Sequence, residues 1–150
     1  MTVIDNVFDH LDFGQRITGR AASISAGTCG ETTVISVSGE IDASNADFTA
    51  TVLNGFATWN GEVVLDLSSL DFIGTQGLRV LIEFSESCRR SNTAVAVVPC
   101  RTLQRLLQVI DIGRHLPVAE SVRSAVRSVE REVTVGPQTF TRVDPEKLRC

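Results

Sequence analysis

The sequence predicts an α/β fold in which a mixed, mostly parallel sheet of about five strands packs with four helices. After an initial pair of strand-like segments, helix-like and strand-like segments alternate along the chain, which is the order expected of parallel strands joined by crossover helices. The apolar runs within this pattern are short and rich in β-branched residues, as in strands that are covered on both faces. We therefore expect one domain over residues 21–131, between an N-terminal extension over 1–20 and a C-terminal tail over 132–150.

Size and charge narrow the classes of function. The chain has 150 residues, of which 43% are apolar and 21% are charged, and this is enough for one buried core. The formal net charge is −4 and the 14 Lys and Arg residues are spread along the sequence, which argues against direct contact with nucleic acid. No apolar run approaches the ~20 residues of a membrane helix, and the sequence does not start with a basic and then apolar leader. We expect a cytoplasmic protein without membrane contact.

The first two strands are predicted to form an antiparallel hairpin. From Ala21 onward apolar and polar residues alternate, and Ile35 and Val37 fall on the same face of the second strand. We expect the turn around residues 27–30 and the end of the second strand at the corner formed by residues 39–42, Gly-Glu-Ile-Asp.

A helix and a central strand are predicted next. Ser44 or Asn45 is a suitable N-cap for a helix with apolar residues at helical spacing, and Asn60 followed by glycine indicates its end. Residues 63–67, Val-Val-Leu-Asp-Leu, are too few for an ordinary helix and are mostly β-branched or aliphatic. We place the middle of the sheet here.

The next helix begins at Thr75, directly after a polar turn. Basic residues Arg89 and Arg90 stand at its C-terminal end, where they suit the helix dipole. Residues 94–98 are the next buried strand, which Pro99 closes. The predicted core positions of the helix are Leu78, Leu81, Ile82, Phe84 and Cys88.

Two helices and a short strand complete the predicted fold. Thr102 is the expected cap of the first helix, and Gly113 its expected end. Residues 116–119 fit a short last strand, and Ser121 fits the N-cap of the final helix. The apolar positions of the first of these helices are Leu103, Leu106, Leu107 and Ile110.

Thr75 is the residue that this pattern singles out for function. A helix start offers unpaired backbone N–H groups and the positive end of the dipole, so a phosphate would be tolerated there while changing what the surface binds. Functional surfaces of α/β folds lie beyond the carboxyl ends of the strands, and both Asp42 and Thr75 follow a strand, so we expect them on one exposed surface. The alternative is that Thr75 is only a helix cap and Asp42 only a turn residue.

The sequence gives little support for a metal, a cofactor or catalysis. The four cysteines and two histidines lack the spacing of metal ligands, and the glycines form no phosphate-binding pattern. No nucleophile has a recognisable neighbouring base, so we expect a non-enzymatic protein. Cys88 near a helix end and Cys100 after a strand are a candidate redox pair, since the sequence leaves their separation open.

Three segments together resemble the STAS domain, the fold of bacterial anti-sigma factor antagonists. They are the corner at residues 39–42, the strand at 63–67, and residues 72–78, Phe-Ile-Gly-Thr-Gln-Gly-Leu. The likeness covers about residues 21–131. It implies a protein that binds an anti-sigma factor of the serine/threonine kinase type and so releases a sigma factor. The sequence leaves open whether the chain also forms a homodimer.

The resemblance also implies the site residues. In the family, phosphorylation of a Ser or Thr at the start of the second helix blocks binding, which makes Thr75 the implied phospho-acceptor. The family typically has an acidic residue before the acceptor and a hydroxyl after it, where this chain has Gly74 and Gln76. The implied partner-binding residues are Asp42, Ser44, Gly74, Gln76 and Gly77, with Arg79 as a further candidate contact one turn into the helix.

Two alternative functions stay open at this point. A STAS module can serve another client, such as a small nucleotide or a stress-signalling assembly. Thiol-based redox regulation through Cys88 and Cys100 is the second alternative.

Overall fold

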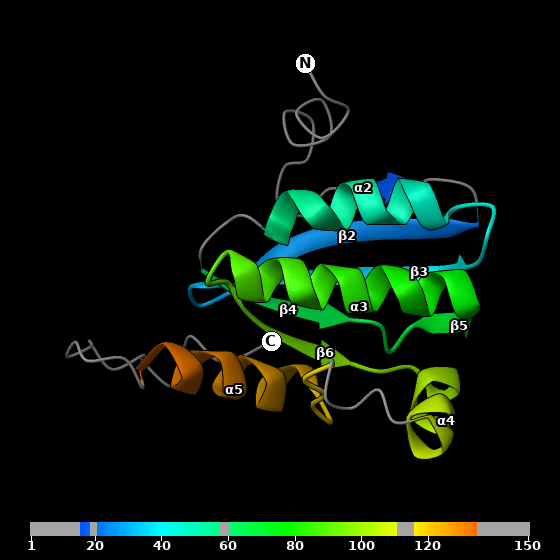
Figure 1. Cartoon of the computed structure of the whole chain (residues 1–150). Coiled ribbons are helices and arrows are strands. Elements are labelled where there is room, and N and C mark those ends of the chain that lie inside the picture. The colour runs from blue at the N-terminus through cyan, green and yellow to red at the C-terminus, as the bar shows by residue number, and fades with distance from the viewer. Residues whose placement is uncertain (1–15, 19–20, 58–60, 111–115, 135–150) are drawn as a thin grey trace.

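The alternation predicted from the sequence is realised as a single mixed sheet with helices on both faces (Figure 1). The computed structural model describes residues 16–18, 21–57, 61–110 and 116–134. The strands are β1 (Arg16–Thr18), β2 (Ala22–Cys29), β3 (Thr32–Ile41), β4 (Glu62–Asp66), β5 (Leu70–Ile73) and β6 (Ala94–Val98). The helices are α2 (Ala46–Ala57), α3 (Thr75–Arg90), α4 (Arg101–Val109) and α5 (Val122–Thr134).

The strand order is β1-β2-β3-β4-β6, and β5 pairs with the end of β3. β1, β2 and β3 are antiparallel neighbours, whereas β3, β4 and β6 run parallel, as does the pair of β3 and β5. The predicted mixed sheet packed with four helices is therefore confirmed within the described residues, with six strands in place of about five.

The two faces of the central strands are covered by different helices. Val63 and Leu65 of β4 point into the main core, which they share with Phe56 of α2 and Phe84 of α3. Val64 points the other way, into a smaller core against α5. Burial on both faces explains why β4 and β6 are almost continuously apolar and why the period of two is visible only in β2 and β3.

Two short strands lie outside the predicted set. β1 adds three residues to the edge of β2, too few to produce a recognisable alternation. β5 falls in the segment that we read as a polar turn, because its two middle residues are exposed. A third difference is that the strand predicted at 116–119 is reduced to a single bridge between Val97 and Val118.

The ends of several elements also differ from the prediction. The N-cap of α4 is Cys100 and not Thr102, and its sulfur accepts a hydrogen bond from the backbone N–H of Leu103 at 3.5 Å. The hairpin turn is confined to residues 30–31, because Cys29 and Thr32 still pair across it. The helix predicted to end at Gly113 already ends at Val109, because Ile110 is its C-cap and has an extended backbone. The predicted end of α2 at Asn60 lies outside the described residues, as do residues 1–15 and 135–150 of the two predicted tails. No helix in the described ranges is long and apolar enough to span a bilayer.

Candidate functional site

The pairing of β5 with β3 brings the candidate site residues together. Ile41 pairs in register with Ile73, and the backbone N–H of Gly74 donates to the Ile41 carbonyl at 2.9 Å. Asp42 follows Ile41 and Thr75 follows Gly74, so both residues emerge at the same carboxyl edge of the sheet. We call the surface formed by Asp42, Ser44 and residues 72–76 the rim.

Thr75 is the first residue of α3 and its side chain is exposed. The N-cap position belongs to Gly74, and its carbonyl accepts a hydrogen bond from the backbone N–H of Leu78 at 3.0 Å. Thr75 is therefore not the helix cap, and within the described residues its hydroxyl has no hydrogen-bond partner. An accessible hydroxyl beside unpaired helix N–H groups can carry a phosphate without loss of an internal bond.

Asp42 lies on the rim and also stabilises the corner between β3 and α2. Its carboxylate oxygen Oδ1 accepts from the Ser44 N–H at 2.9 Å and from the Ser44 hydroxyl at 2.5 Å. The backbone N–H of Asp42 donates to Asn45 Oδ1 at 3.0 Å, and Asn45 Nδ2 donates to the Glu40 carbonyl at 2.7 Å. These bonds hold the corner between β3 and α2, so the turn-residue reading of Asp42 is supported as well as its surface position.

The remaining predicted contact residues divide into exposed and buried ones. Gln76 and Arg79 are exposed on the first turns of α3, but Gly77 is buried below the rim. A Cβ atom on Gly77 would lie 2.6 Å from Cγ1 of Ile73 and 2.9 Å from Cγ2 of Ile41. Gly77 therefore lets α3 approach the ends of β3 and β5, and it acts on the rim through packing.

Phe72 is a rim residue that the sequence analysis did not select. Its side chain is 45% exposed, and two of its ring atoms would lie 3.4 and 3.7 Å from a Cβ atom on Gly74. The signal in the sequence was an aromatic residue between Asp71 and a helix start. It could have been recognised only with the knowledge that residues 70–73 form an edge strand.

The candidate redox pair is not assembled. Cys88 and Cys100 are both buried with free thiols, but they lie at opposite ends of β6: the Cys88 carbonyl accepts from the Thr93 N–H before the strand, and Cys100 follows the strand as the cap of α4. β6 has five residues and spans about 16 Å, whereas the Cα atoms of a disulfide are separated by roughly 4.4–6.8 Å. Burial also raises the pKa of the Cys88 thiol to about 12, which makes it a poor nucleophile. Cys29, by contrast, is disulfide-bonded.

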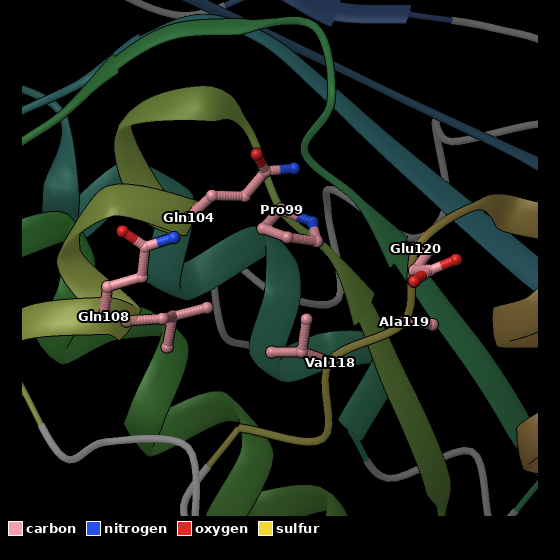
Figure 2. Close-up of a pocket in the computed structure, with 7 residues that line it drawn as sticks. Pro99, Gln104, Gln108, Val118, Ala119 and Glu120 are labelled. Atoms are coloured by element: carbon pink, nitrogen blue, oxygen red, sulfur yellow. The ribbon is translucent and has the colours of Figure 1, made fainter.

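Two further observations concern ligands. Within the ranges that the structure describes, no group of three His, Cys, Asp or Glu side chains is placed to hold a metal ion. A pocket of about 440 Å³ lies between α4 and residues 118–120, and Figure 2 shows Gln104 and Gln108 on one side of it and Val118 on the other. None of the predicted site residues lines this pocket.

Comparison with known proteins identifies a family and several relatives that share this sheet order. The family model described as the STAS domain matches residues 23–125. Osmosensory protein A of Mycobacterium tuberculosis is 31% identical over 101 residues, which make up 65% of this chain and 64% of that protein. This chain therefore spans slightly less than two thirds of that relative. Anti-sigma-F factor antagonist RsfA of the same species is 32% identical over 97 residues, or 62% of this chain and 76% of the relative.

Solved structures support the fold. The crystal structure of an anti-sigma factor antagonist from Mycobacterium paratuberculosis aligns with a TM-score of 0.63 at 20% identity, over 76% of this chain and 99% of that chain. The structure of a putative anti-sigma factor antagonist from Thermotoga maritima gives a TM-score of 0.61 at 19% identity, over 72% and 95% of the two chains. At these identities the likeness extends to the arrangement of strands and helices.

Proposed function

Because this chain belongs to the STAS domain family, we propose that it is an anti-sigma factor antagonist that uses the rim to bind an anti-sigma factor of the serine/threonine kinase type and so releases a sigma factor. We place this activity in the cytoplasm, where sigma factors act. The role requires binding and no catalysis. The similarity to an anti-sigma-F factor antagonist, at 32% identity, favours this partner class over others.

The observation that carries the proposal is the exposure of Thr75 at the start of α3, beside Asp42 and in a position that is not the helix cap. A hydroxyl with no structural duty can be modified or left unmodified while the fold stays the same. Such a residue is suited to a switch on a binding surface.

The charges around Thr75 give the switch its direction. Glu40 is exposed and Asp42 is half-buried, and both lie at the end of β3 next to the start of α3, while Asp71 is a further exposed carboxylate of β5. A phosphate adds about −1.5 to −2 charges to this acidic surface. We propose that phosphorylation of Thr75 blocks the partner by repulsion and by the cost of removing the phosphate from water.

The two alternative functions receive less support. A redox switch through Cys88 and Cys100 would require the ends of β6 to come together. No feature of the described residues favours a nucleotide or a stress-signalling assembly over an anti-sigma factor as the binding partner.

Affinity capture from the native cell tests the proposal. Wild type, Thr75→Ala and Thr75→Glu serve as baits, and Gln104→Glu adds the same charge at an exposed position on α4 as a matched control. We expect a kinase-fold anti-sigma factor on wild type, Thr75→Ala and Gln104→Glu, and at least a tenfold reduction on Thr75→Glu. Retention of no such protein by the wild type contradicts the proposed function. Equal retention by all four baits removes Thr75 from the mechanism.

A further inference from the structure

Phe72 stands out among the apolar side chains of the surface. In the described part of the chain the exposed large hydrophobic residues are Phe72, Val109, Ile110 and Val118. The last three lie on or just after α4 or in the segment that bridges to β6, so Phe72 is the large apolar side chain that the rim itself exposes. An aromatic ring that is 45% exposed beside a candidate interface is a typical binding anchor.

The Phe72 ring lies against Gly74. The backbone of Gly74 has φ −94° and ψ −175°, an extended conformation that any residue can adopt, so the backbone does not require glycine here. A Cβ atom at Gly74 would lie 3.4 Å from the ring, in ordinary van der Waals contact, so a side chain that extends from it toward the ring would compete with the ring for space. The ring therefore lies beside the turn that leads into Thr75.

The surroundings of the ring are acidic. Glu40 is the in-register partner of Phe72 on β3, and parallel partners in register place their side chains on the same face of the sheet. Asp42 lies one residue beyond the paired strand ends, whereas Asp71, which precedes Phe72, is exposed and has no in-register partner on β3. Arg79 is the basic residue that the first turns of α3 contribute.

We propose that Phe72 is the apolar anchor of the rim and that the surface it fits is an apolar pocket edged by basic side chains on the anti-sigma factor. This inference rests on the proposed function and adds to it the chemistry of the partner. The acidic side chains around Phe72 complement such a basic edge and accelerate the encounter. A phosphate on Thr75 would lie near the ring. It would either have to enter the partner's apolar pocket or keep the partner from closing over Phe72.

Calorimetric titration of the anti-sigma factor captured by the wild-type chain, purified for this purpose, tests the anchor. Phe72→Ala is expected to raise the dissociation constant by roughly tenfold to a hundredfold, in the range of aromatic hot spots. Phe72→Leu keeps an apolar side chain, so the logarithm of its dissociation constant is expected to rise by less than half as much as for Phe72→Ala. Val109→Ala removes an apolar side chain that is 84% exposed on α4, and it is expected to bind as the wild type does.

A double-mutant cycle tests the coupling of Phe72 to Gly74. Gly74→Asp introduces a side chain whose Cβ atom would touch the ring, and we expect it to displace the ring and to weaken binding in the wild-type background by several-fold. In the Phe72→Ala background the ring is already gone, so the same change is expected to have a smaller effect. Equal effects of Gly74→Asp in both backgrounds overturn the role that we assign to Gly74.

The controls separate failure of the anchor from failure of the proposed function. Circular dichroism and urea unfolding establish that each variant is folded, which we expect because Phe72 lies on the surface. If Thr75→Glu abolishes binding and Phe72→Ala binds as tightly as the wild type, the anchor is wrong and the proposed function stands. If the wild type binds no anti-sigma factor, both are wrong.

Discussion

The substitution Gly77→Ala offers the sharpest test of how the rim is built. The added Cβ atom would lie 2.6 Å from Ile73 Cγ1, 2.9 Å from Ile41 Cγ2 and 3.2 Å from Ile41 Cβ. Contacts below 3.0 Å force a shift, and here the neighbours are β-branched side chains that are 2% and 0% exposed and cannot move into water. Either α3 moves away from the sheet edge or the two isoleucine side chains adopt strained rotamers.

The expected magnitude follows from two opposing contributions. Overpacking of a filled core costs about 1–3 kcal/mol. The change from glycine to alanine in a helix returns at most about 1 kcal/mol, and less in the first turn, where residue 77 lies. We therefore expect Gly77→Ala to lower the free energy of unfolding by about 1–2 kcal/mol and to weaken partner binding as well, because the displaced helix start carries Thr75.

Urea unfolding at neutral pH measures this loss, with Gly27→Ala as the matched control. A Cβ atom at Gly27 on β2 would meet nothing within 4 Å, so the control is expected to be neutral or slightly stabilising. A Gly77→Ala variant that is as stable as the wild type would refute the argument that close approach of α3 to β3 and β5 positions the rim.

Three further predictions concern residues away from the rim surface. Burial, together with the charges of Glu62 and Glu31, raises the pKa of Glu130 above 4.5, and its buried Oε1 atom has no partner in the described structure. The folded chain then holds more protons than the unfolded chain between pH 4.5 and the raised pKa, so the free energy of unfolding falls as the pH rises through that window. Urea titrations should therefore show Glu130→Gln to be more stable than the wild type at pH 7 but not at pH 4. Parallel pH profiles of the two proteins would count against this. Cys88, which is 0% exposed with a thiol pKa of about 12, should resist iodoacetamide at pH 8 until the chain is unfolded, and rapid labelling of the native protein would contradict that assignment. Gly39→Ala should lower the urea midpoint, because Gly39 has a φ of +94° and its Cβ would collide with the Ala21 carbonyl; an unchanged midpoint would contradict this clash.

The sequence predicts those elements whose burial follows one clear period. The alternation in β2 and β3 appears as predicted, since one face of that part of the sheet is buried and the other is partly exposed. The apolar positions Leu81, Phe84 and Cys88 of α3 all lie in the main core. Long-range pairing was needed to find β5, because two exposed residues in a strand of four cannot be distinguished from a turn by pattern alone.

The helix α4 shows where an apolar pattern overstates burial. Leu103 is fully buried, but Ile110 at the other end of the same predicted face is 42% exposed. A helix of nine residues at the end of the sheet has its first turn against the core and its last turn beyond it. Periodicity describes which face of a helix is apolar, and it does not describe how far the sheet extends beneath that face.

The candidate site was predictable in its position but not in its internal division of roles. Asp42 and Thr75 both follow strands, and the carboxyl edge of the sheet brings them together as expected. The sequence could not separate exposed Thr75 from buried Gly77, because that difference depends on the packing of α3 against Ile41 and Ile73. The distance between Cys88 and Cys100 could not be predicted either, since it depends on which ends of β6 they occupy.

Hydrogen–deuterium exchange on the complex with the anti-sigma factor tests most directly whether the rim is the binding surface. We expect slower exchange over residues 40–44 and 72–79 in the complex and unchanged exchange over α5, which covers the opposite face of β4 and β6. Protection confined to α4 and α5, with the rim exchanging as it does in the free chain, would contradict it.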